Sequence, residues 1–443
     1  MKDLLIIGAG ASGLSSAHFA KKAGLDVAVF ESSDRVGGKI QTSSIENCFD
    51  GNNPNGGGQL IAEHGPLGWL DHEPLLQELC RDLGLTPIES QAADEHRYIL
   101  HNQRLVPLPL SPGAFLRSAL LSLSGKIRFA IEPWANLSDN ANESVWAFAA
   151  RRFGVEAANT FTQAICGGLF AANPRETDMN AMFAPLVGVE HRDGQITRSM
   201  RGFARRAAQS GGTAICTFQD GLEVLPLAMA ESLSGHVQLE SPIDNAHFHN
   251  DAWSLYIDGE EVGRGRNLLL TCPAKTTATL LRHLEPSLID FADAARGQDL
   301  TVTTLVYPEI DLAAPLHGFG ILGSTDPTFP IQSVQFLHNS FSTHTPRHCA
   351  VLRVMTKEPQ FDTRELQALL GLPAKPKFAV THTTPMGVPH YRVGHAQRFE
   401  KLEDRLAAWR GLHLGGDSFS GIGINAAVRR GAKIITKILS ADS

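Results

Sequence analysis

The feature that most constrains this chain is a glycine turn near its start, set between an apolar run and a helical pattern. Residues 3–7 read Asp-Leu-Leu-Ile-Ile, which is typical of a buried parallel strand, and the turn at residues 8–13 follows at once. A helical pattern then covers residues 14–23. A second apolar run at residues 27–30 ends at Glu31. This order of strand, glycine turn, helix, strand and acid predicts a Rossmann-like unit that binds a dinucleotide.

Each residue type in the turn has a physical task. Gly8 permits the tight turn, Gly10 allows a pyrophosphate to approach the backbone, and Gly13 allows helix and strand to pack closely. The helix N-terminus then presents free N–H groups and partial positive charge to the phosphates. Glu31 can accept hydrogen bonds from ribose hydroxyls, which favours an adenosine without a 2′-phosphate. Two adjacent glycines at residues 37–38 are expected where backbone again lies close to a cofactor.

A second strand and glycine turn lie near the other end of the chain. Residues 412–417 form the expected strand, residues 421–425 the turn, and residues 426–439 a helical pattern. Asp417 can accept a hydrogen bond from a ribityl hydroxyl, and the helix N-terminus can face a flavin ring. The alternative is a plain strand-to-helix connection with glycine caps. The match of all three elements favours the flavin.

Composition narrows the function class. The chain has 443 residues, which suggests about three domains, and its formal net charge of −7 gives no support for nucleic-acid binding. Its 6 cysteines form no CxxC pair, so neither a zinc site nor a redox dithiol is indicated, and a reduced cytosolic setting fits. His247 and His249 share one strand face without an evident third ligand, so no metal is predicted. The N-terminus reads as a strand and not as a signal peptide, and no apolar stretch reaches the roughly 18 residues of a spanning helix.

Local signals predict four further features. Ser111 followed by Pro112 predicts the start of one helix, and Ser124-Gly125 the start of another. Residues 157–165 have a helical pattern, and residues 51–58 read as the tip of a hairpin.

Two segments carry basic residues on helical patterns. Residues 107–134 combine apolar helices with Arg117, Lys126 and Arg128, a pattern that suits either a membrane surface or packing on the protein's own domain. Residues 197–208 are a strongly basic helix candidate, most simply a solvated face.

The chain resembles flavin-dependent protoporphyrinogen oxidases, within the wider amine oxidase and phytoene desaturase superfamily. The likeness runs nearly end to end, and the glycine fingerprint alone is shared by many flavoproteins. The distinctive segments are residues 31–38, 64–70, 167–174, 221–226, 318–320, 387–395 and 421–425. The most particular of them contains Pro389, Tyr391 and Gly394-His395. Leu67 departs from the family pattern, in which a polar or basic residue is common.

The resemblance implies an α/β protein with a discontinuous Rossmann-like FAD-binding domain of the glutathione-reductase type. It also implies a mixed-sheet substrate domain and a helical domain, which relatives use for membrane docking. The implied FAD-binding domain comprises residues 1–90, 219–287 and 396–443. The implied substrate domain comprises a hairpin at residues 91–106, a helix at residues 193–218, and residues 288–395, and the helical domain spans residues 107–192.

The resemblance also implies site residues. The expected FAD contacts are Gly8, Ala9, Gly10, Ala11, Ser12, Gly13, Glu31, Ser32, Lys39, Gly65, Pro66, Leu67, Gly68, Ile243, Asp417, Ile422, Gly423 and Ile424. The expected porphyrinogen contacts are Arg97, Gly168, Phe319, Leu322 and Met355. No nucleophilic triad or other catalytic side chain is predicted, because the flavin N5 carries the chemistry.

The implied activity is oxidation of protoporphyrinogen IX to protoporphyrin IX in haem biosynthesis, by three two-electron steps with dioxygen as acceptor and hydrogen peroxide as product. Coproporphyrinogen III as substrate, or an amine or polyene for a related flavin oxidase, stays open, as does a flavin-free scaffold. FAD is expected to be non-covalent, since no cysteine lies in the C-terminal glycine turn. The expected location is cytoplasmic. Attachment to the inner face of the cell membrane and a homodimer stay open.

Overall fold

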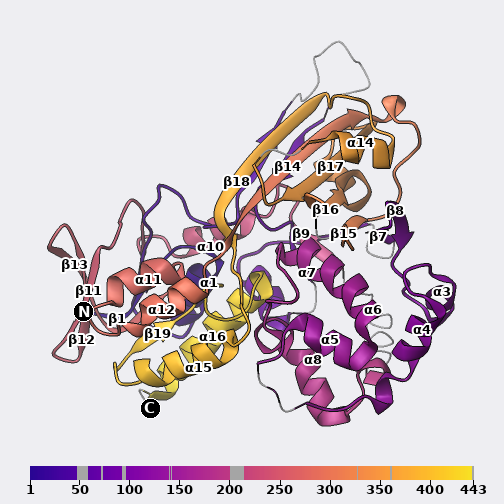
Figure 1. The fold of residues 1–443 in the computed structure, drawn as a ribbon. Helices are drawn as coiled ribbons and strands as arrows, with labels where there is room; N and C mark the ends of the chain where they lie inside the picture. The colour runs from indigo at the N-terminus through magenta and orange to yellow at the C-terminus, as the bar shows by residue number, and fades with distance from the viewer. Residues whose placement is uncertain are drawn as a thin grey trace.

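The computed structural model describes residues 1–46, 58–70, 73–91, 96–138, 140, 142–199, 214–326, 328–359 and 362–441. Two large sheets lie in separate parts of the molecule, and a group of helices from the first half of the chain lies beside them (Figure 1). Strands and helices both contribute extensively, so the α/β expectation is confirmed.

The first sheet contains the N-terminal fingerprint. Its strand order is β10 (Val237–Gln238), β2 (Val27–Phe30), β1 (Lys2–Ile7), β13 (Glu260–Leu270), β12 (Ala252–Ile257) and β11 (Asn245–His249). The C-terminal strand β19 (Leu412–Leu414) pairs in parallel with the end of β13, and β13 pairs in parallel with β1. Segments from the start, middle and end of the chain therefore build one sheet, as expected for a discontinuous dinucleotide fold.

Alternating side chains of β1 pack on opposite faces of this sheet, since successive strand residues point to opposite sides. Leu4 and Ile6 join one core, and Leu5 and Ile7 join another. The first core is covered by α1 (Ala11–Lys22), α2 (Pro74–Asp82), α10 (Val224–Ser232) and α16 (Ile424–Ala441). The second is covered by α11 (Ala274–Leu281), α12 (Ser287–Ala294) and α15 (His395–Leu406). The parallel strands are thus buried on both faces, which explains their continuous apolar runs.

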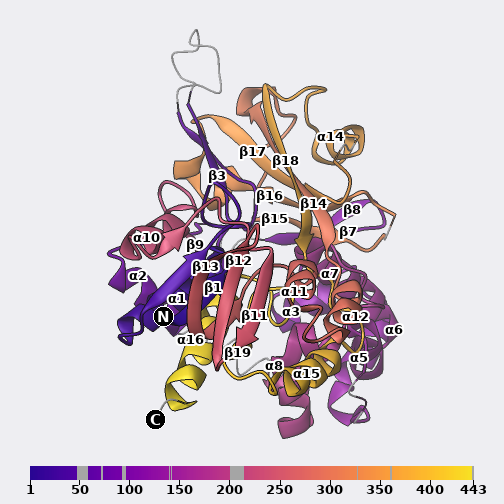
Figure 2. The same cartoon turned by 90° about the vertical axis from the view of Figure 1, so that its left-hand side faces the viewer.

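The second large sheet lies above the first in Figure 2. Its order is β18 (Phe378–Val388), β14 (Gln298–Pro308), β17 (Cys349–Thr356), β16 (Ile331–Phe336), β15 (Gly320–Ser324), β7 (Arg97–His101) and β8 (Arg104–Pro107). One face packs on α14 (Arg364–Leu370). Short elements complete this region: η3 (Glu309–Asp311), α13 (Leu337–Ser340) and η4 (Ser342–His344). Two small sheets pair β3 (Thr42–Ile45) with β4 (Leu60–Glu63), and β9 (Ile215–Thr217) with β5 (Trp69–Leu70) and β6 (Ile88–Glu89).

The helical part is held by a buried ion pair. Arg152 and Glu132 are both fully buried and in direct contact, and Glu132 also accepts from the N–H groups of Ile196 and Thr197. A buried charge is tolerated when it is paired and hydrogen-bonded in this way. The elements here are α3 (Pro112–Arg117), α4 (Leu123–Ala130), η1 (Glu132–Trp134), α5 (Val145–Phe153), α6 (Val155–Ala157), the π-helix η2 (Ala158–Thr162), α7 (Gln163–Phe170) and α8 (Met179–Asp193).

Local sequence signals predicted several elements well. The hairpin β7–β8 and the helix that begins after Ser111 are confirmed, and the Ser111 hydroxyl caps that helix by accepting from Ala114 N. The next helix begins earlier than expected, because Ser122 and not Ser124 provides the cap, accepting from Gly125 N. The helix expected at residues 157–165 contains a π-helical turn.

Other expectations fall outside the described residues. These are most of the basic helix at residues 197–208, the same part of the expected helix at residues 193–218, and all but the last residue of the hairpin tip expected at residues 51–58.

Candidate active site

The N-terminal turn has the shape that a dinucleotide requires. Gly8 adopts a φ of +105°, and a Cβ on Gly13 would lie 1.9 Å from the Gly8 carbonyl oxygen, so both positions need glycine. A Cβ on Gly10 would meet no protein atom within 4 Å. The open space at Gly10, at the start of α1, is therefore available to a group outside the chain, such as a pyrophosphate.

Glu31 lies at the carboxyl end of β2, where a ribose is expected. Its carboxylate accepts from Ala9 N at 2.8 Å, from Ser33 N at 3.0 Å and from the Ser32 hydroxyl at 3.3 Å. These donors orient the carboxylate at the rim of the turn. Ile243 lies in the core on the same side as Phe30 of β2, with only 9% of its surface exposed.

Lys39 joins the first segment of the chain to the last. Its Nζ lies 2.7 Å from Asp417 Oδ2, and Gly37 N donates to Ala9 O at 2.9 Å. A Cβ on Gly65 would lie 1.8 Å from Lys39 O. The expected cofactor residues at 8–13, 37–39, 65 and 417 therefore surround one region of the molecule.

A buried arginine from the second sheet reaches this region. The Arg353 guanidinium donates to the carbonyl oxygens of Glu63 and Gly65 and, at 2.9 Å, to Gln335 Oε1. Burial lowers the pKa of Arg353 to about 10, so it remains a cation at neutral pH. Burial also raises the pKa of Glu63 to about 7, against the opposing hydrogen bonds from Leu222 N and the Thr42 hydroxyl. Nothing in the local sequence around Arg353 indicated this contact.

The rest of the segment from Gly65 shows why Leu67 departs from the family pattern. The Leu67 side chain packs in a core with Leu60, Val306 and Phe341, so only its backbone can face a cofactor. Gly68 lies against the Cys216 carbonyl, where a Cβ would be 2.2 Å from the oxygen. Pro66 lies between Gly65 and Leu67 in the sequence.

The C-terminal turn is held from several sides. The Tyr391 hydroxyl donates to Asp417 O, and His395 Nε2 donates to Phe419 O at 2.9 Å. The two rings stack with centroids 4.1 Å apart. Burial lowers the pKa of His395 to about 4, so the imidazole is neutral at neutral pH. Gly416 N donates to the Ser12 hydroxyl at 3.1 Å, which ties this turn to α1.

The end of the turn faces open space and the second sheet. A Cβ on Gly423, whose φ is +95°, would meet no protein atom within 4 Å. Ile424 is buried in the first core, whereas Ile422 packs on the apolar cluster of Met355, Val302 and Leu300. The last turn therefore lies between the two sheets. Ala11 at the start of α1 completes the N-terminal half of the site.

The expected substrate residues fall into two groups on the second sheet. The Arg97 guanidinium lies 4.8 Å from the centroid of the Phe319 ring. Arg97 begins β7, and Phe319 directly precedes β15, which pairs in parallel with β7. Met355 lies on β17 of the same sheet and packs against Ile422. Gly168 is packed on the Leu322 carbonyl, where a Cβ would be 1.5 Å away, so it fixes α7 on the sheet. The expected set is thus not one continuous lining.

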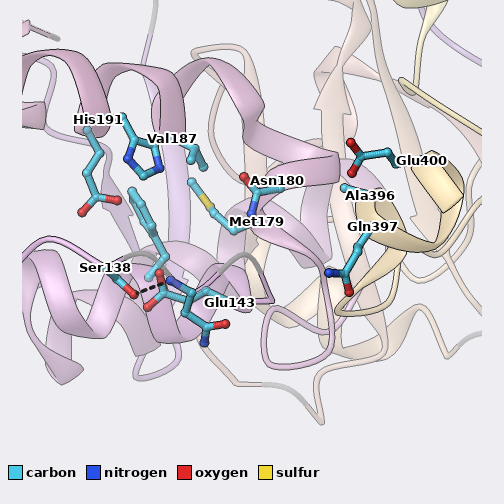
Figure 3. A pocket seen from close by; sticks show the side chains of 12 residues that line it. Ser138, Glu143, Met179, Asn180, Val187, His191, Ala396, Gln397 and Glu400 are labelled. Carbon is cyan, nitrogen blue, oxygen red and sulfur yellow. Dashed lines mark hydrogen bonds between the residues drawn. The ribbon is translucent and has the colours of Figure 1, made fainter.

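A separate cavity of about 330 Å³ lies between α5, α8 and α15 (Figure 3). Its walls include Glu143, Met179, His191 and Glu400, and no expected cofactor or substrate residue lines it. Within the described residues, no group of three or more histidine, cysteine or acidic side chains is placed to hold a metal. The His247 ring packs at a tilt of 50° against the His283 ring, with centroids 5.0 Å apart.

These contacts fit FAD. Open space at Gly10 and Gly423, a carboxylate at the end of β2, and a helix N-terminus at each turn are what a flavin dinucleotide needs. The model of the flavin-containing amine oxidoreductase family matches residues 11–433, and the chain belongs to this family. It is an oxidoreductase whose cofactor is FAD.

Similar proteins extend over the whole chain. Protoporphyrinogen oxidase 2 of Arabidopsis thaliana is 25% identical over 99% of this chain and 94% of its own length. Coproporphyrinogen III oxidase of Bacillus subtilis is 23% identical, over 99% of this chain and 98% of its own. The crystal structure of a candidate protoporphyrinogen oxidase from Exiguobacterium has the same fold, with a TM-score of 0.79, 21% identity, and coverage of 100% of this chain and 99% of that one. None of the described helices combines the length and apolarity needed to cross a membrane.

Proposed function

We propose that this protein oxidises protoporphyrinogen IX to protoporphyrin IX with dioxygen as the acceptor. Three dioxygen molecules become three hydrogen peroxide molecules as the substrate loses six hydrogen atoms. The observation that carries the proposal is the pairing of the Arg97 guanidinium with the Phe319 ring on the sheet that also brings Met355 to the turn at Ile422. The names of full-length relatives support a porphyrinogen as the substrate.

The chain's own residues have distinct tasks in this proposal. Bound FAD supplies the two-electron chemistry. Arg97 anchors a substrate carboxylate, because its planar fork can form two parallel hydrogen bonds with one. Phe319 and Met355, each less than a tenth exposed, offer apolar contact to the macrocycle, as does Leu322. Tyr391 and His395 hold the turn that contains Asp417 and Phe419.

The experiment is anaerobic mixing of the purified yellow protein with each porphyrinogen, followed by absorbance near the flavin band. Bleaching by protoporphyrinogen, with peroxide formed on admitting air, supports the proposal. Faster bleaching by coproporphyrinogen III would move the assignment to that substrate, a relevant outcome since a full-length relative carries that name. Bleaching by an amine and by neither porphyrinogen would refute it.

A membrane surface is a proposed partner of residues 107–134, which run from the end of β8 through α3 and α4 to η1. This segment exposes large apolar side chains: Leu110, Leu116, Leu123, Ile127, Ile131 and Trp134. Arg117 is exposed nearby, whereas Arg128 donates to the carbonyls of Arg151 and Arg152, and Lys126 to Leu116 O. Exposed apolar side chains of this kind favour insertion at a membrane–water interface.

Strand pairing supports the proposed division into an FAD-binding domain (residues 1–90, 219–287 and 396–443), a substrate domain and a helical domain. The first large sheet takes its strands from the three segments of the FAD-binding domain. The second takes them from the hairpin β7–β8 and from residues 298–388.

A further inference from the structure

One row of residues crosses the second sheet from Arg97 to Arg353. Gly320 pairs with Arg97 on one side and with Gln335 on the other, and Gln335 pairs with Arg353. Directly paired residues on neighbouring strands point to the same face. The Arg353 guanidinium on this face reaches the carbonyls of Glu63 and Gly65, so the row is turned towards the expected cofactor segment.

Gly320 leaves the middle of this row without a side chain, and this break between Arg97 and Gln335 is called the Gly320 slot below. Its φ is +136°, and a Cβ there would lie 2.1 Å from the Val334 carbonyl oxygen, so no other residue fits. The backbones of β7 and β16 on either side are separated by two strand spacings, or about 10 Å. Arg97 and the Phe319 ring flank one side of the slot, and Gln335 flanks the other.

The chemistry of Arg353 fixes the orientation of the Gln335 amide. Arg353 Nη1 lies 2.9 Å from Gln335 Oε1. A guanidinium only donates hydrogen bonds, so the amide oxygen must face Arg353 and the NH₂ group must point away from it. Gln335 is only half-buried, so its side chain is not sealed in the core.

We propose that Gln335 is a substrate-binding residue that donates, across the Gly320 slot, to the carboxylate held by Arg97. Arg353 acts as a positioning residue, because it fixes the amide and also binds the backbone that supports the cofactor. This deepens the proposed porphyrinogen oxidation and rests on it. The slot selects a substrate with a carboxylate at its edge, because it presents a guanidinium on one flank and amide N–H donors on the other.

The test compares Gln335→Leu and Gln335→Glu with wild type in three measurements: FAD content, steady-state oxidation of protoporphyrinogen and coproporphyrinogen, and fluorescence titration with the porphyrin product. Loss of a hydrogen bond to a charged group predicts a KM and a porphyrin Kd raised about tenfold in Gln335→Leu, with kcat within about twofold. FAD content stays normal. Gln335→Glu raises KM at least as much, because it removes the donors and adds a negative charge. The double variant with Arg97→Ala loses less than the product of the single losses, since both residues hold one carboxylate.

Gln367→Leu is the matched control, because Gln367 in α14 bonds to Thr363 and Ala374 on the other side of the sheet. An unchanged KM and porphyrin Kd in Gln335→Leu overturns the assignment, and so does a loss of FAD equal to the loss of activity. If wild type neither oxidises a porphyrinogen nor binds a porphyrin, the proposed function itself falls and takes this inference with it.

Discussion

Lys39 and Asp417, 378 positions apart in the sequence, form an ion pair of 2.7 Å between the first and last segments of the FAD-binding region. About a third of each side chain is exposed, so the pair is partly screened by solvent. Both residues are expected to contact FAD. The ion pair therefore joins the first and last segments of the chain at the expected cofactor site.

Removing either partner should lower the affinity for FAD more than it lowers the stability of the fold. An exposed pair contributes only about 0.2–1 kcal/mol to folding, so Lys39→Met and Asp417→Asn should change the melting temperature of the apoprotein little. FAD affinity should fall by about threefold to tenfold in each, measured by quenching of flavin fluorescence, because each loses a polar contact with the cofactor. Unchanged FAD affinity in both variants would remove these residues from the cofactor site.

Gly10→Ala should fold and yet bind FAD poorly. A Cβ at this position meets no protein atom within 4 Å, so it costs the protein little, but it occupies the space assigned to the pyrophosphate. Circular dichroism should match wild type while FAD content falls at least tenfold. Gly188→Ala, another substitution into open space, is the control and should bind FAD normally. Equal FAD content in the two variants would contradict the assignment of the pyrophosphate to the space at Gly10.

Arg97→Ala should raise KM for the porphyrinogen with normal FAD content. A charge-assisted hydrogen bond is worth about 1.5–3 kcal/mol, so kcat/KM should fall by roughly tenfold to a hundredfold. Arg97→Lys should recover part of the loss, because an ammonium keeps the charge but not the fork. If KM does not change, the carboxylate is held elsewhere.

Glu63 should make the fold less stable as the pH rises. Burial raises its pKa from 4.5 to about 7, so its contribution is complete below about pH 4.5 and is lost as the pH rises through 7, when a buried charge forms. Melting temperatures measured from pH 5 to pH 8 should therefore decline more steeply in wild type than in Glu63→Gln. The exposed Glu260→Gln should follow wild type. Parallel curves for all three proteins would show that Glu63 is charged throughout.

The apolar patch from α3 to η1 should mediate binding to anionic vesicles. Leu123→Ser combined with Trp134→Ser removes two side chains that are 75% and 80% exposed, and vesicle co-sedimentation should fall. Ile310, 92% exposed on η3, provides the control Ile310→Ser, which should sediment like wild type. If the wild-type protein stays in the supernatant when vesicles are present, the patch does not bind membranes.

The sequence by itself determined the elements whose signals are local. The turn at residues 8–13 predicts its strand and helix because glycine spacing and apolar periodicity act over a few residues, and β1, α1 and β2 follow that order. The proline after Ser111 likewise marked the start of α3. The start of α4 was misplaced by two residues, because Ser122 and Ser124 are both adequate caps and only the fold selects between them.

Tertiary structure alone decided the contacts between distant segments. Arg353 appears in the sequence as one arginine within an apolar strand, yet the sheet register buries it beneath Gly65 and beside Gln335. Leu67 lies close to Gly65 and Pro66 in the sequence, but its side chain belongs to a core that also contains residues of β4, β14, α13 and β17. Such contacts depend on strand order and register, which bring together residues hundreds of positions apart. No local preference encodes these contacts, because their free energy arises only when the sheets close on each other.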